Sequence, residues 1–178
     1  LLADAGYPRP SRIFPSGCPR YPDSNQIVEK KYDCGYVGSI SPDNGIETIT
    51  RSLARVPHGR LLLLGSGPTG YKDMLGKLIM ALNLEDRVDL KDWAEPHRIG
   101  KIMSTCRVGL VPISRACGPE KRQFASPLKL VEWMAAGVPV IASRVPSVMH
   151  RIGDSESAYI VEPDNPQNLA DAMRRLQD

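Results

Sequence analysis

The sequence lacks several features that mark particular classes of protein. No stretch approaches the ~20 apolar residues of a membrane-spanning helix, and the N-terminus shows no signal-peptide pattern. Aromatic residues make up only 6% of the chain and the net charge is only +3, so no nucleic-acid partner is expected. The four cysteines and three histidines show no metal-ligand spacing, so we expect no metal and a cytoplasmic protein with reduced thiols.

Short apolar runs alternating with amphipathic segments dominate the rest of the sequence. With 42% apolar and 24% charged residues, a chain of 178 residues is long enough for one globular domain and an extension. Strands are predicted near residues 35–38, 61–64, 87–90, 108–111, 138–142 and 159–161, with helices between them. This alternation predicts an α/β, Rossmann-like three-layer domain with a six-stranded parallel sheet.

The N-terminal part has a different composition. Proline and glycine interrupt any helical or strand period there, so residues 1–33 are interpreted as a connecting segment and residues 34–178 as the domain. A short strand is possible near residues 12–14. The abrupt start at Leu1-Leu2 leads us to expect further sequence on the N-terminal side.

The stretch from residue 126 to 143 predicts a helix start, a helix, a tight turn and a buried strand. Ser126 is expected to cap the helix and Pro127 to occupy its first turn. A basic loop over residues 113–125 is expected to precede it. The apolar face of the helix is expected to comprise Leu128, Val131 and Ala135, with Leu130 and Met134 beside it.

Two charged residues near the start of this helix are not expected in a helix that only packs against a sheet. Lys129 lies in the first turn, where the helix dipole disfavours a cation by about 0.3–1 kcal/mol. A bound anion would explain the lysine, because backbone N–H groups and the dipole at a helix start favour one. Glu132, one turn deeper, could then accept hydrogen bonds from sugar hydroxyls. A solvated Lys–Glu pair explains the two residues equally well.

The basic loop adds Arg115, Lys121 and Arg122 to Lys129 within fifteen residues. Open α/β sheets bind ligands beyond the carboxyl ends of their strands, where this loop is expected to lie. Cations gathered at that edge would suit a diphosphate. For Lys121 and Arg122 taken singly, a solvated side chain is the simpler interpretation.

Gly65, Gly67 and Gly70 match the dinucleotide fingerprint G-x-G-x-x-G after a predicted strand. An NAD site is the less favoured interpretation, because Pro68 removes an N–H from the turn and the motif follows the second strand. Gly65 and Gly67 either let a ligand approach the backbone or serve backbone shape alone. Trp93, after the next strand, either stacks on a nucleotide base or caps the sheet edge.

From about residue 36 to 176 the sequence resembles the C-terminal, donor-binding domain of GT-B glycosyltransferases, especially the retaining enzymes of the group 1 type. The residues that carry the likeness are Gly38 with its loop to Gly45-Ile46, Leu63–Pro68, Ser126–Ser143 and Val161–Pro166. In addition, Ile13–Gly17 resembles the hinge between the two domains of that family.

The resemblance implies a UDP- or GDP-sugar as donor, no metal or other cofactor, and an acceptor bound by an N-terminal domain that this chain lacks. Any membrane association would belong to that missing half. Glu132 is implied to bind the ribose, and Lys129 to stabilise the departing diphosphate during hexosyl transfer. The chain alone is expected to be inactive. The residues implied at or beside the diphosphate are Ser39, Ser126, Pro127, Leu128 and Lys129.

Three positions depart from the family pattern. Ser39 and Asn44 stand where the family usually carries an arginine and a lysine, and Phe124 stands where it usually carries an acid. The loss of two cations either weakens the site, is compensated by Arg115 or Lys121, or marks a loss of transferase activity. A non-catalytic nucleotide-sugar-binding module therefore remains an alternative. A nucleotide-sugar epimerase would need a further acid or histidine in the crevice and is less favoured.

Overall fold

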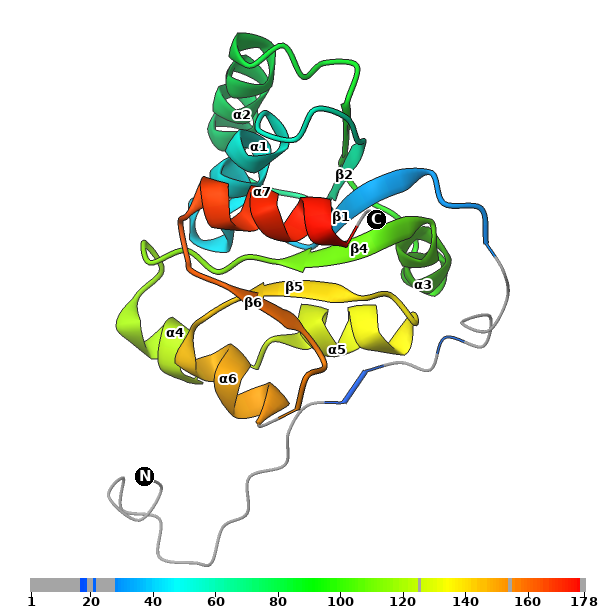
Figure 1. Ribbon diagram of the computed structural model, residues 1–178. Helices are drawn as coiled ribbons and strands as arrows, with labels where there is room; N and C mark the ends of the chain where they lie inside the picture. The colour runs from blue at the N-terminus through cyan, green and yellow to red at the C-terminus, as the bar shows by residue number, and fades with distance from the viewer. Residues whose placement is uncertain (1–16, 19–20, 22–27, 125, 154, 177–178) are drawn as a thin grey trace, which may run out of the picture.

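A parallel sheet of six strands, in the order β3-β2-β1-β4-β5-β6, forms the centre of the part that the structure describes (Figure 1). The structure is a computed structural model and describes residues 17–18, 21, 28–124, 126–153 and 155–176. It confirms the predicted α/β fold with its six-stranded parallel sheet. The strands are β1 (Tyr32–Val37), β2 (Leu61–Leu64), β3 (Val88–Lys91), β4 (Cys106–Val111), β5 (Val140–Ser143) and β6 (Tyr159–Val161).

Helices cover both faces of the sheet (Figure 1). One face carries α1 (Ile46–Leu53), α2 (Thr69–Ala81) and α7 (Pro166–Arg175). The other carries α3 (Pro96–Ser104), α5 (Leu128–Ala135) and α6 (Pro146–Ile152), with α4 (Pro119–Phe124) against α6. The strand order reverses between β1 and β4, which places the topological switch point beside the single turn η1 (Pro42–Asn44) and the start of α5.

The packing of α5 on the sheet fixes how its N-terminus meets the strand ends. The Trp133 side chain is fully buried and lies over Gly35 of β1 and Gly109 of β4, where any Cβ would collide with the indole ring. Glycine at both positions therefore lets the helix approach these two strands closely. The buried face of α5 is formed by Leu130 and Trp133, whereas Leu128 is 43% exposed.

Several local predictions were wrong. The buried face of α5 is centred on Leu130, which was expected beside the apolar face, and on Trp133, which was not expected there, because the indole packs on two glycines of the sheet. Ser126 does not cap α5: Pro127 occupies the N-cap position and no side chain caps the helix. The expected loop over residues 113–125 contains α4. Most of the predicted connecting segment, including the possible strand near residues 12–14, lies outside the described residues.

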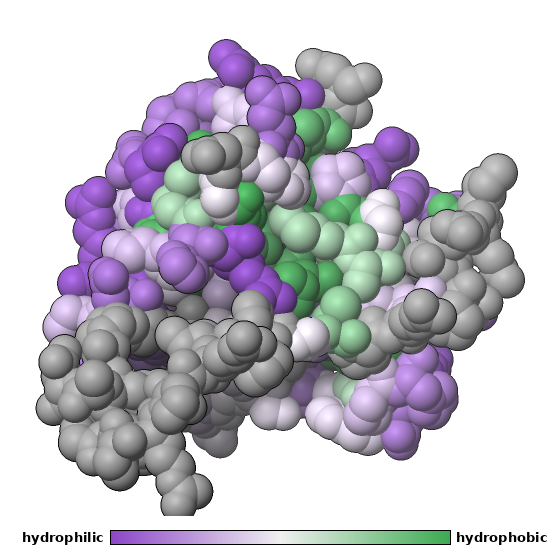
Figure 2. Space-filling model, turned by 90° about the horizontal axis from the view of Figure 1, so that it is seen from below, coloured by the Kyte–Doolittle hydropathy of each residue, from purple (hydrophilic) through white to green (hydrophobic). Residues whose placement is uncertain are grey.

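Hydrophobic residues gather near the middle of the face seen from the side of α5 and α6, with hydrophilic residues around them (Figure 2). Partly buried residues that pack against the core on this side include Ala94, Ile99, Ile102, Met134, Ile152 and Ile160.

Candidate functional site

A hollow of about 200 Å³ opens where the N-terminus of α5 meets the ends of the central strands. We call it the α5 hollow. Three separate segments bring polar side chains to it: Asn44 from η1, Lys121 from α4 and Lys129 from α5. The remaining lining residues are Val111, Pro112, Ile113, Ser126, Pro127 and Leu128. The predicted Ser126–Lys129 segment thus lines a concave site at the carboxyl edge of the sheet.

Lys129 reaches from the first turn of α5 to the end of β1. Its side chain is half-buried, and a Cβ on Gly38 would collide with its Cε atom. The ammonium lies 5.6 Å from the centroid of the Tyr36 ring, within the range of a cation–π contact. Burial lowers the pKa of Lys129, the positive charge of Lys121 lowers it further, and Glu132 opposes both. Lys129 makes no ion pair with a described residue.

The backbone after β1 runs against the backbone after β2. The Gly38 N–H donates to the Leu64 carbonyl at 2.9 Å, and the Ile40 N–H donates to the Ser66 carbonyl at 2.8 Å. A Cβ on Gly65 or Gly67 would collide with the carbonyl oxygen of Gly38 or Ile40. Close contact between the two backbone segments therefore accounts for glycine at both positions. Neither a ligand nor a dinucleotide site is needed to explain the motif.

Glu132 lies one helical turn beyond Lys129 and is half-buried. Within the described part of the chain its carboxylate makes no hydrogen bond and no ion pair, although it lies close enough to Lys129 to affect the pKa of that residue. It does not line the α5 hollow itself. An unpaired, half-buried carboxylate has free acceptor capacity, which is what a hydroxyl-bearing ligand would use.

The positions where family members usually carry two cations are neutral here and occupied within their own loop. The Asn44 side chain is only 8% exposed and donates to the Ser39 carbonyl at 2.9 Å and to Ser41 Oγ at 3.0 Å. The Tyr36 hydroxyl also donates to the Ser39 carbonyl, at 2.7 Å. Ser39 itself is exposed and does not line the α5 hollow. The loop after β1 therefore holds a fixed conformation beside the α5 hollow but contributes no positively charged side chain to it.

Trp93 belongs to a different concavity from Lys129. It is 64% exposed and lines a groove of about 680 Å³ between the β2–β3 edge and α3. Lys91, Arg98 and Lys101 line the same groove. Its large exposed area argues against a tight cap on the sheet edge. The Gly65 N–H donates to the Lys91 carbonyl at 2.9 Å, which holds the chain after β2 against the end of β3.

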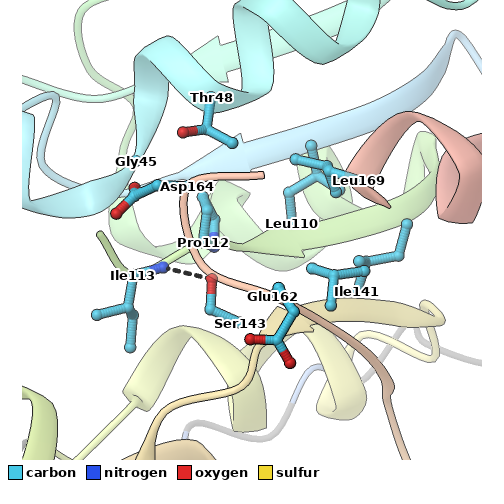
Figure 3. A pocket seen from close by; sticks show the side chains of 11 residues that line it. Gly45, Thr48, Leu110, Pro112, Ile113, Ile141, Ser143, Glu162, Asp164 and Leu169 are labelled. Carbon is cyan, nitrogen blue, oxygen red and sulfur yellow. Dashed lines mark hydrogen bonds between the residues drawn. The ribbon is translucent and has the colours of Figure 1, made fainter. Parts of the chain in front are cut away.

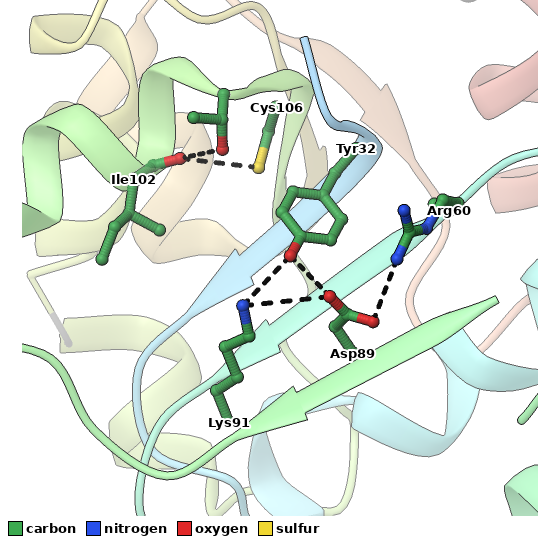
Figure 4. Close-up of polar contacts among 7 residues, drawn as sticks. Tyr32, Arg60, Asp89, Lys91, Ile102 and Cys106 are labelled. Atoms are coloured by element: carbon green, nitrogen blue, oxygen red, sulfur yellow. Dashed lines mark hydrogen bonds and ion pairs between the residues drawn. The ribbon is translucent and has the colours of Figure 1, made fainter. Parts of the chain in front are cut away.

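Asp89, an acid that a dinucleotide site would require for the ribose, is engaged in a polar cluster on the sheet (Figure 4). The Tyr32 hydroxyl donates to its Oδ2 at 2.6 Å, and Arg60 and Lys91 lie 3.3 and 3.8 Å from the carboxylate. The Tyr32 hydrogen bond is the main cause that lowers the pKa of Asp89. These partners stabilise the sheet edge and leave the carboxylate little capacity for a ribose.

A third concavity lies near α1, α7 and the end of β5 (Figure 3). At about 10 Å³ it is scarcely large enough for one water molecule, so it is no donor site. There the Ile113 N–H donates to Ser143 Oγ at 3.0 Å. Glu162, also at this pocket, pairs with Arg115 at 3.6 Å and with Arg144 at 3.1 Å. Arg115 is therefore directed away from the α5 hollow.

Two structural contributions were not foreseen. Tyr36 places its ring beneath the Lys129 ammonium, and Asn44 fixes the loop after β1. For Tyr36, the sequence feature that could have indicated this role is its position two residues before Gly38. Among the described residues, no three His, Cys, Asp or Glu side chains come together as metal ligands would. None of the described helices is both long and apolar enough to cross a membrane.

Comparisons with known proteins agree with the fold. The family description "Glycosyl transferases group 1" matches residues 19–178. The α-D-kanosaminyltransferase of Streptomyces kanamyceticus is 28% identical over 147 residues, which cover 80% of this chain and 36% of that enzyme. The chain spans about a third, or less, of the length of the curated relatives it matches.

Solved structures show the same architecture. The Anabaena protein HepE in complex with UDP and glucose aligns with a TM-score of 0.67 at 24% identity, over 80% of this chain and 37% of that one. The C-terminal domain of a glycosyl transferase group 1 family protein from Francisella tularensis aligns with a TM-score of 0.66 at 21% identity, over 84% and 76%. The six-stranded domain thus has the fold of GT-B C-terminal domains, and the chain belongs to the glycosyl transferases group 1 family.

Proposed function

We propose that this chain is the donor-binding domain of a hexosyltransferase, and that the α5 hollow holds the diphosphate of a UDP- or GDP-sugar. The observation that carries the proposal is Lys129, a half-buried cation without an acidic ion-pair partner among the described residues, at a helix start beside Gly38. Holding that charge partly out of water costs free energy, as its lowered pKa reflects. A bound diphosphate would restore a counter-ion to it.

The rest of the nucleotide would extend along the strand ends. Glu132, whose carboxylate has no hydrogen bond or ion pair with a described residue, would accept from the ribose hydroxyls, one turn from the phosphate position. The exposed ring of Trp93 would lie beside the base, at the entrance of the neighbouring groove. Gly38, which contacts the Lys129 side chain, and Gly65, which packs on the Gly38 carbonyl, would lie beside the nucleotide.

The chemistry that this arrangement can supply is positioning and electrostatic stabilisation. When the bond between the sugar and the diphosphate breaks, negative charge develops on the leaving oxygen. A lysine ammonium and the N-terminus of α5, both fixed beforehand, would stabilise that charge without a metal. An acceptor site in a further domain would complete the reaction, so we expect this chain to bind nucleotide without turning over.

Isothermal titration with UDP and GDP, compared with uridine and guanosine, tests the proposal. Lys129→Ala should weaken one nucleoside diphosphate about 10- to 100-fold, the range of a lost charge-assisted hydrogen bond, and leave the nucleoside unchanged. Glu132→Ala should weaken diphosphate and nucleoside alike. Lys77→Ala and Glu85→Ala, which remove exposed charges elsewhere, should change neither. Equal losses for diphosphate and nucleoside in Lys129→Ala would remove the phosphate role, and absence of any binding heat would reject the site.

The neutral residues Ser39 and Asn44 favour a second candidate, a module that binds a nucleotide-sugar without transferring it. The two candidates differ in a longer protein that includes an acceptor domain. Incubated with nucleotide-sugars that carry a radiolabel in the sugar, a transferase would release nucleoside diphosphate and pass the labelled sugar to an acceptor or, with water as acceptor, release it as free sugar. Binding without release would identify the module.

A further inference from the structure

We infer that Lys121, on α4, is a second phosphate-binding cation of this site and takes the place of the two cations absent from the loop after β1. This inference rests on the proposed function. Lys121 lines the α5 hollow together with Lys129, although the two lysines come from different helices. Their charges are close enough that Lys121 is felt at the Lys129 side chain.

The loop after β1 offers no cation in this chain. Asn44 points its amide at the Ser39 carbonyl and at Ser41 Oγ, so both of its N–H donors have partners within the loop. Ser39 is exposed and lies outside the lining of the hollow. A diphosphate in the hollow would therefore meet only Lys129 unless another segment contributes.

The other cations of the segment after β4 are directed elsewhere. Arg115 pairs with Glu162, and the guanidinium of Arg122 donates to the Arg115 carbonyl. Neither lines the hollow. Lys121 is thus the cation from this segment that does, and its neighbour Arg122 on the same helix provides a matched comparison.

Lys121 forms an ion pair with Asp43 of the loop after β1. The Lys121 ammonium lies 3.1 Å from Asp43 Oδ2, and the two side chains are 45% and 46% exposed. An exposed pair of this kind contributes little stability, so it can be exchanged for a phosphate at small cost. The Asp43 carbonyl separately accepts the Ser114 N–H at 3.0 Å, which keeps the two loops together when the side-chain pair opens.

In this geometry Asp43 competes with the diphosphate for Lys121. Substitutions of Lys121 and of Asp43 should therefore change the diphosphate affinity in opposite directions. Lys121→Gln should weaken UDP or GDP roughly tenfold, as expected for one charge-assisted contact. Asp43→Asn should strengthen the same ligand several-fold, because it releases Lys121 and removes a negative charge. In the double variant, the gain from Asp43→Asn should shrink, because no lysine is left to release.

Titration of the full chain with UDP, GDP and the two nucleosides decides the inference. Arg122→Gln, with the same charge change on the same helix, should alter the affinity less than twofold. If Lys121→Gln matches Arg122→Gln while Lys129→Ala still loses the diphosphate, Lys121 has no phosphate role and the proposed function stands. If Asp43→Asn gains equally with and without Lys121, the exchange is refuted. If the wild-type chain binds neither diphosphate, both proposals fail.

Discussion

Substituting Gly38 by alanine tests whether the loop after β1 and the phosphate lysine act as one unit. Gly38 has a φ of +144°, a conformation that side-chain-bearing residues rarely adopt. Forcing alanine into it costs about 1–3 kcal/mol, which in a domain of this size lowers the melting temperature by about 2–12 °C. The new Cβ would also collide with Cε of Lys129 and come within 2.9 Å of its Nζ. The lysine is the flexible partner, so it must move.

Gly38→Ala should therefore reduce the affinity for a nucleoside diphosphate nearly as much as Lys129→Ala, and spare the nucleoside. Calorimetric titration at a temperature well below the lowered melting point separates binding from stability. The decisive comparison is a double-mutant cycle. In the Lys129→Ala background, Gly38→Ala should cost little further affinity, because the displaced ammonium is already gone. Fully additive losses would refute the coupling between the glycine and the lysine.

Three further predictions follow from charge and packing. Because burial lowers the pKa of Lys129, the lysine should lose its proton, and the diphosphate its affinity, at a pH below the ordinary lysine pKa of about 10.4. Lys129→Arg should flatten this pH dependence in a series of titrations, because arginine keeps its charge. Tyr32→Phe should cost about 0.5–1.5 kcal/mol in urea unfolding at neutral pH. The lowered pKa of Asp89 adds stability above the ordinary carboxylate range that is lost as pH falls through its folded value, so this variant should lose less stability on acidification. Trp133→Ala should cost about 3–5 kcal/mol in the same assay, and Trp133→Phe clearly less; equal costs would contradict the packing of the indole over two glycines.

The fold class could be predicted from the sequence, and so could the segment of residues 126–129 that lines the candidate site. Unbroken apolar runs such as Leu61–Leu64 are typical of strands covered on both faces, and all four of these residues are buried. Asn165 accepts a hydrogen bond from the Asn168 N–H at 3.0 Å and Pro166 begins α7, and asparagine and proline are favoured residue types at these two helix positions. Such features depend on neighbours within a few residues, which a linear sequence displays directly.

Which charged side chains meet could not be predicted from the sequence. Lys121, Arg115 and Arg122 look alike in the sequence, yet contacts with Asp43, Glu162 and the Arg115 carbonyl direct them to different places. The face of α5 that is buried was likewise set by two glycines on strands β1 and β4, far from the helix in sequence. Close approach between distant segments depends on how whole elements pack, and no local pattern encodes it.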